Sequence, residues 1–96
     1  MRGPTSRSPA VTIDESRAAH IFRDAEGHFR EDNAVNRQRL IGTASRQGNL
    51  LGTDRFGNTW YAENLADGQV WVRVRGGKII NGGLNHRPRA ITEVAR

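Results

Sequence analysis

Residues 53–83, TDRFGNTWYAENLADGQVWVRVRGGKIINGG, decide the fold, because apolar side chains recur at every second position along much of this stretch. Such alternation sends successive side chains to opposite faces of a β-strand. Three turn signals separate the β-prone runs, namely Phe56-Gly57-Asn58, Ala66-Asp67-Gly68 and Gly76-Gly77. We therefore predict an antiparallel meander of about four strands, which begins near Leu51.

The residues before the meander have helical spacing. Thr12 and Glu15 have the spacing of a capping box, which predicts a first helix over residues 14–23. Its apolar stripe would consist of Ala18, Ile21 and Phe22.

A second helix is predicted to start at a cap formed by Asp32 or Asn33 and to run to about Ser45. Its buried face would comprise the stem of Arg37 with Leu40, Ile41 and Ala44. The glycines of GNLLG, residues 48–52, then end the helical pattern. The predicted fold class is α+β, with two N-terminal helices packed on one side of a roughly four-stranded antiparallel sheet.

The chain has 96 residues, which suit one domain, here assigned to residues 12–96. Residues 1–11 are rich in Pro, Ser, Gly and Arg and are predicted to be a disordered linker or an expression remnant. Nothing resembles a signal peptide or a membrane span, so we expect the isolated domain to act in water and to need no membrane.

Charge and cysteine content narrow the function. The net charge is +5, from 15 Lys+Arg against 10 Asp+Glu, and this favours a polyanionic partner. The absence of cysteine excludes disulfides, a thiolate nucleophile and a zinc site built on sulfur.

One face of the central strand combines an aromatic ring with cations. Because side chains alternate, Trp71, Arg73 and Arg75 should share the face opposite the core, and Lys78 follows the Gly-Gly turn. Single-stranded nucleic acid is bound by such a combination, since bases stack on indole while guanidinium groups hold phosphate. The alternative is an ordinary solvated sheet face that carries a tryptophan.

Residues 20–32, HIFRDAEGHFRED, collect groups that suit metal-independent RNA cleavage. That reaction needs a base for the 2′-OH, an acid for the leaving 5′-oxygen, and a cation on the phosphate. His20, Arg23, His28 and Arg30 are of the required types. The structural alternative is that the histidines cap a helix or brace a loop and that Arg30 is a surface charge; His86 is predicted to be a surface residue.

A third segment, KIINGGLN at residues 78–85, contains two glycines that permit close approach of a ligand, and Asn81 and Asn85 offer hydrogen bonds to a phosphate or a base. An ordinary turn is the alternative. The acidic residues near His28 interleave with arginines and lack a fixed metal-ligand spacing, and nucleotide-cofactor and zinc-hydrolase motifs are absent. We predict neither a metal site nor a cofactor.

Three blocks together resemble a C-terminal domain of bacterial polymorphic and contact-dependent inhibition toxins. They are HIFRDAEGHFRED, NRQRLIGTAS and LGTDRFGNTWYAENLADGQVWVRVRGGKIINGGLN, within residues 18–88. The resemblance implies a ribonuclease of the superfamily that groups barnase, EndoU, certain colicins and RelE. It implies helices against a four-stranded antiparallel sheet, cleavage of tRNA or other RNA without metal, and neutralisation by a cognate immunity protein. Such a domain is part of a secreted or cell-surface toxin and acts in the cytoplasm of the target cell.

The leading hypothesis is a metal-independent endoribonuclease that leaves a 2′,3′-cyclic phosphate. The predicted catalytic groups are His20, His28, Arg23 and Lys78. The predicted substrate-binding groups are Trp71, Arg73, Arg75, Arg30, Trp60, Asn81 and Asn85. The charge of the domain predicts that the immunity protein is acidic. The alternatives are a non-catalytic basic RNA-binding module, and a domain whose basic face binds only an acidic protein.

Overall fold

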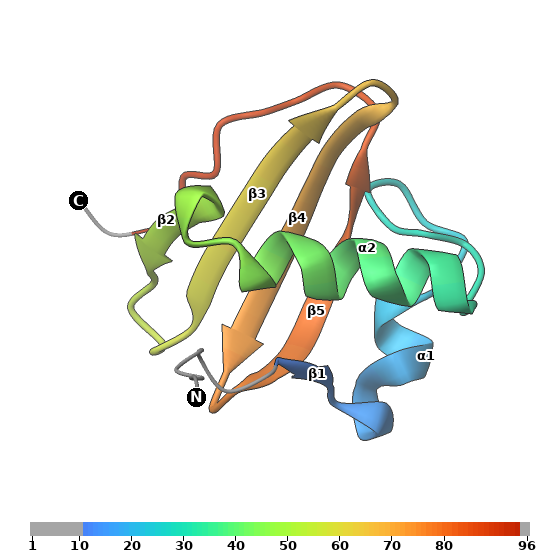
Figure 1. Cartoon of the computed structure of the whole chain (residues 1–96), viewed down its shortest axis with the longest axis horizontal. Helices are drawn as coiled ribbons and strands as arrows, with labels where there is room; N and C mark the ends of the chain where they lie inside the picture. Colours follow the sequence, from blue (N-terminus) through green and yellow to red (C-terminus); the bar gives the residue numbers. More distant parts are fainter. Residues whose placement is uncertain (1–10, 95–96) are drawn as a thin grey trace, which may run out of the picture.

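The computed structural model describes residues 11–94, which form an α+β fold with one five-stranded mixed sheet (Figure 1). The strand order is β1-β5-β4-β3-β2. The strands are β1 (Thr12–Ile13), β2 (Leu50–Thr53), β3 (Thr59–Leu65), β4 (Gly68–Arg75) and β5 (Lys78–Asn85). The predicted linker lies outside the described residues except for Val11, which packs against the core.

The predicted antiparallel pairing of consecutive strands is confirmed, but the sheet has five strands and is mixed rather than a four-stranded antiparallel sheet. Strands β2 to β5 pair antiparallel in chain order, and their turns fall at the three predicted signals. A β-bulge between Arg73 and Val74 of β4 interrupts the register with β5. The alternation is also as predicted, because Val70, Val72 and Val74 are all buried in the main core.

The edge strand β1 was not predicted, and the capping box at Thr12 is wrong. Thr12 and Ile13 pair in parallel with Lys78 and Ile79, and the amide of Asp14 donates to the carbonyl of Ile79 at 3.0 Å. Asp14, rather than Thr12, caps the first helical turn through its side chain. A two-residue strand is too short to produce a periodic pattern.

The first helix is shorter than predicted and is broken. A 3₁₀ turn, η1 (Glu15–Arg17), leads into α1 (Ala18–Ile21), and Phe22 is already extended. Residues 22–33 form the loop that connects α1 to α2. Among the helices of residues 11–94, none combines the length and apolar composition that crossing a bilayer requires.

The second helix, α2 (Ala34–Ser45), agrees with its prediction. The side chain of Asn33 caps it by accepting a hydrogen bond from the amide of Asn36 at 2.8 Å. Leu40 and Ala44 are buried as predicted, Thr43 is buried in addition, and Ile41 is half-buried. A 3₁₀ turn, η2 (Gln47–Asn49), joins the helix to β2.

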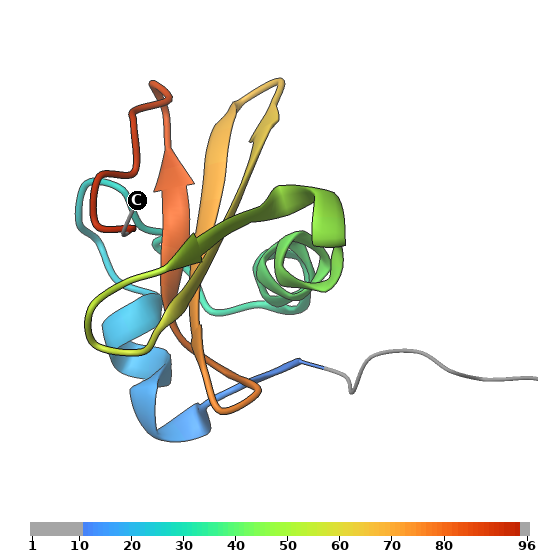
Figure 2. The ribbon, with the colours of Figure 1, turned by 90° about the vertical axis from the view of Figure 1, so that its left-hand side faces the viewer.

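The two helices do not share one side of the sheet, so that part of the prediction is wrong. Figure 2 shows α2 on one side of the sheet and α1 on the other, where it lies beside β5. The pairing of β1 with β5 fixes the start of the chain at this edge, and Ile21 and Phe22 enter the core there. The loop after α1 is therefore left on the face of the sheet that α2 does not cover.

That second face has its own small core. It consists of Trp60 and Trp71 from the sheet with Ile91 and Val94 from the C-terminal segment. This segment runs from the end of β5 back to β2 (Figure 1), where Asp54 and Val94 form an isolated β-bridge. Both faces of the central strands are thus covered.

Candidate functional site

The structure brings His20, Arg23 and His28 into one cluster. The guanidinium of Arg23 lies between the two imidazoles, with Nη1 3.1 Å from Nδ1 of His20 and Nη2 3.2 Å from Nε2 of His28. The imidazole centroids are 6.3 Å apart. Because the guanidinium can only donate, each imidazole turns a lone pair toward it in this arrangement.

The orientation of His28 is fixed by a second hydrogen bond. Its Nδ1–H donates to the carbonyl oxygen of Ile21 at 2.9 Å, so Nε2 is the acceptor that faces Arg23. Burial lowers the pKa of His28 below its ordinary value of 6.5, and the Arg23 cation lowers it further, whereas the bond to Ile21 opposes this shift. A neutral imidazole with an oriented lone pair is the form that a general base requires.

The loop that holds His28 rests directly on the sheet, because Gly83 has no side chain. A Cβ at residue 83 would overlap the carbonyl of Gly27 and the Cα of His28. The indole N–H of Trp71 donates to the carbonyl of Gly27 at 2.9 Å, and the Trp71 ring lies edge-on to His28. The glycines of KIINGGLN are predicted to let a ligand approach the backbone closely. In the structure, the loop around Gly27 and His28 makes this close approach instead.

An open cavity of about 500 Å³ adjoins the cluster. Arg23 and His28 line it, as do Arg30 and His86. Arg30 lies 3.6 Å from Asp24 in an exposed ion pair, which solvent leaves weak. The carboxylates of Asp24, Glu26 and Glu31 also line the cavity, so its lining carries both signs of charge beside His28.

Two predicted substrate-binding residues belong to the core instead. Trp60 is 1% exposed and Trp71 7%, and their rings stack with centroids 5.7 Å apart beneath the C-terminal segment. The prediction that these indoles stack bases is therefore wrong for this fold. Trp71 instead supports the loop that carries His28.

The other predicted cations lie away from the histidines. Lys78 is exposed at the β4–β5 turn, five positions before Gly83, which corresponds to roughly 16 Å along a strand. This spacing does not place Lys78 beside His28, so the structure lends no support to its predicted role in stabilising charge there. Arg73 is half-buried over the ring of Trp60, and exposed Arg75 donates to Asn58 and to the carbonyl of Phe56.

The two asparagines of the third segment have structural partners. Asn81 is buried, and its Oδ1 accepts from the amide of Gly82. Asn85 donates to Oε1 of Gln69 at 2.8 Å. Neither side chain is among those that line the cavity beside the histidines.

A buried carboxylate organises the β2–β3 turn, and no feature of the sequence pattern beyond the Asx-turn form of DRFGN points to it. Burial raises the pKa of Asp54, but hydrogen bonds from the Trp60 indole, the amides of Asn58 and Phe56, and the Asn58 side chain lower it to about 2. Asp54 is therefore ionised at neutral pH.

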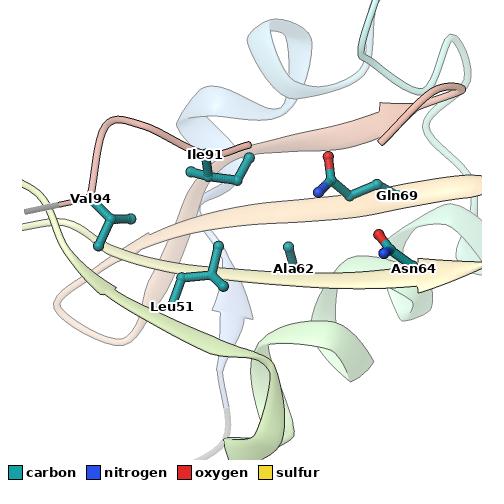
Figure 3. A pocket seen from close by; sticks show the side chains of 6 residues that line it. All are labelled: Leu51, Ala62, Asn64, Gln69, Ile91 and Val94. Carbon is teal, nitrogen blue, oxygen red and sulfur yellow. The ribbon is translucent and has the colours of Figure 1, made fainter. Parts of the chain in front are cut away.

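A second cavity, of about 290 Å³, lies between the sheet and the C-terminal segment (Figure 3). Apolar and amide side chains line it: Leu51, Ala62, Asn64, Gln69, Ile91 and Val94. None of these groups titrates near neutral pH or acts as a nucleophile, so this cavity offers no acid–base chemistry.

Within residues 11–94, no group of three His, Asp or Glu side chains is placed to hold a metal ion. Comparisons with protein-family models, with curated proteins and with solved structures find no match to this chain. The resemblance to toxin ribonucleases therefore rests on the sequence blocks, and any functional proposal rests on the chemistry of the site.

Proposed function

We propose that the protein is an endoribonuclease that cleaves RNA through attack of the 2′-OH and needs no metal. The observation that carries this proposal is the position of Arg23, whose guanidinium is hydrogen-bonded to both His20 and His28. A base, an acid and a phosphate-binding cation are the groups this reaction needs. The net charge of +5 suits a polyanionic substrate, and the cavity beside Arg23 and His28 gives a ligand access to them.

In the proposed mechanism, Nε2 of His28 takes the proton from the 2′-OH. The 2′-oxygen attacks phosphorus, and the bond from phosphorus to the 5′-oxygen breaks. The proton that the leaving 5′-oxygen needs comes from His20, which takes up a proton once phosphate oxygens have replaced its ring as an acceptor for Arg23, so the products are a 2′,3′-cyclic phosphate and a 5′-OH. Phosphate oxygens replace the two imidazoles as acceptors for Arg23 and receive its charge-assisted hydrogen bonds.

The direct test is cleavage of total tRNA by the purified protein in EDTA, followed on a denaturing gel. The His20→Ala variant should cleave at least about a hundredfold more slowly, because a positioned proton donor contributes about that much. Arg17→Gln is the control, since Arg17 is an exposed residue one turn away whose side chain pairs with Asp14 and is not among the hydrogen-bond partners of either histidine. Equal rates for wild type and His20→Ala would remove His20 from the mechanism.

The second candidate is a non-catalytic RNA-binding module. Several arginines without acidic partners favour it, as the next subsection describes. Salt-sensitive binding of tRNA by wild type, with the tRNA intact in both EDTA and magnesium, would establish this function and contradict the nuclease.

We extend the proposal to a toxin domain with an acidic immunity protein, delivered from a bacterial cell surface into the cytoplasm of a target cell. A protein that neutralises such an enzyme would place carboxylates over Arg23 and Arg30. Expression of the chain alone should then stop bacterial growth, while the His20→Ala variant should not. Equal growth of cells that express either form would contradict the toxin assignment.

A further inference from the structure

Positive charge without acidic partners gathers at a second place, the turn between β2 and β3. Among residues 11–94, ion pairs with carboxylates engage six arginines: Arg17, Arg30, Arg37, Arg39, Arg46 and Arg89. Arg23 is engaged by the histidines. Of the arginines that remain, Arg55, Arg73 and Arg75 lie at this turn or contact it.

A cavity of about 390 Å³ opens beside the turn. Its lining includes Arg55, Phe56 and Arg73, with Trp60 as its buried wall. The guanidinium carbon of Arg73 lies 4.8 Å from the centroid of the Trp60 ring, and its Nε is buried without an acceptor in the described part of the chain. Arg73 is therefore held in place by an indole while its charge lacks a counter-ion.

The two carboxylates that also line this cavity are engaged elsewhere. Asp54 accepts four hydrogen bonds from its own turn and from Trp60. Glu93 lies 3.3 Å from Arg89. Neither forms an ion pair with Arg55 or Arg73 within residues 11–94, so these two cations stay available to an anion from outside.

Phe56 supplies an aromatic surface at the same place. Its side chain is 65% exposed at the tip of the turn, and the guanidinium carbon of Arg55 lies 5.0 Å from its ring centroid. Arg75 holds this tip by donating to the carbonyl of Phe56 at 2.9 Å. An exposed ring beside cations is the arrangement on which single-stranded nucleic acids stack their bases.

We infer that this turn is a second nucleic-acid site, in which Phe56 stacks a base of single-stranded RNA while Arg55 and Arg73 hold its phosphate. The choice of RNA as ligand rests on the proposed function. The site lies on the same face of the sheet as the catalytic cluster, because His28 contacts Trp71, Trp71 stacks on Trp60, and Trp60 lies under Arg73. RNA bound there extends beyond the scissile linkage.

The test uses a fluorescent 2′-O-methyl oligonucleotide of about ten nucleotides, a length that single-stranded sites accommodate. It lacks the 2′-OH nucleophile, so binding is measured without cleavage. Phe56→Ala should weaken binding about fivefold or more, as loss of one stacked base does. Val35→Ala is the matched control, because Val35 is another exposed apolar side chain, 69% exposed, on the opposite side of the sheet.

The charge contribution is tested with Arg55→Gln against Arg17→Gln, since each change removes one exposed positive charge. Arg55→Gln should weaken binding more. Equal affinity of the Phe56→Ala and Val35→Ala variants, or no binding by wild type at low salt, would overturn the inference. So would an oligoglutamate of equal charge that binds wild type as tightly as the oligonucleotide does.

Failure of the nuclease proposal gives a different result. In that case wild type would leave tRNA intact, yet oligonucleotide binding would still depend on Phe56. Conversely, cleavage that depends on His20, together with binding that is indifferent to Phe56, would keep the nuclease and remove the second site.

Discussion

The residue with the greatest chemical consequence is His28, because one ring nitrogen is fixed by the backbone and the other faces a cation. Its bond to Ile21 selects the tautomer, and burial favours the neutral ring by lowering its pKa. The side chain of His20 is exposed, and within residues 11–94 its ring is hydrogen-bonded only to Arg23. In the proposed mechanism, this asymmetry favours His28 as the base and His20 as the acid.

The pKa of His28 should accordingly lie below 6.5 in a histidine NMR titration of the folded protein. It should rise in an Arg23→Gln variant, because the neighbouring cation disfavours a second positive charge. Titration at or above 6.5 in the wild type would contradict the assignment of the base.

The same shift links pH to stability. Just below pH 6.5 the unfolded chain binds more protons at His28 than the folded chain does. The stability that His28 contributes is therefore complete above pH 6.5 and is lost as the pH falls through the lower folded pKa.

At the scale of elements, the site depends on how the loop after α1 sits on β5. Gly83 has no Cβ, the Trp71 indole holds the carbonyl of Gly27, and Phe22 and Phe29 form a β-bridge across the loop. Together with the hydrogen bond from His28 to Ile21 at the end of α1, these contacts orient His28. The geometry of the proposed site is thus set by the sheet and by α1 together.

Gly83→Ala should destabilise the protein by roughly 1–3 kcal/mol in urea unfolding, because the new methyl group overlaps backbone that cannot move independently. It should also slow RNA cleavage by displacing His28. Gly42→Ala is the matched control: its Cβ meets nothing within 4 Å, and it should stabilise α2 by about 0.5–1 kcal/mol. A Gly83→Ala variant as stable as wild type would contradict this role of the loop.

The elements that were predicted correctly are those with many repeats of one pattern. The alternation of Val70, Val72 and Val74 predicts β4 and its inner face, and the cap signal at Asp32 or Asn33 predicts the start of α2, which Asn33 caps. The strand β1 and the broken first helix were missed because each spans only a few residues.

For the site, the grouping of His20, Arg23 and His28 could be predicted, because the three are close in sequence and carry complementary chemistry. The burial of Trp71 could not, since the residues that cover its face, Ile91 and Val94, come from the far end of the chain. The distance of Lys78 from the histidines could not be predicted either, because it depends on where the loop after α1 crosses β5.

At the scale of the whole molecule, ion pairs engage only part of the positive charge. Among the arginines of residues 11–94, six pair with carboxylates, whereas Arg23 lies at the histidine cluster and Arg55, Arg73 and Arg75 lie at or contact the β2–β3 turn. Exposed ion pairs add little to the free energy of unfolding. Their main effect here is that the paired carboxylates offset the positive charge of those arginines. The proposal that a polyanion binds this face of the sheet rests on the arginines that lack acidic partners there.

The most direct measurement of the central claim uses a single-stranded DNA that contains one ribonucleotide, incubated with the protein in EDTA. Attack by the 2′-OH predicts one cut, immediately 3′ of that ribose, with a 2′,3′-cyclic phosphate on one product and a 5′-OH on the other. The cut should be lost when the ribose is 2′-O-methylated and in the His28→Ala variant. Cleavage at deoxyribose linkages, or products that carry a 5′-phosphate, would contradict the proposed chemistry.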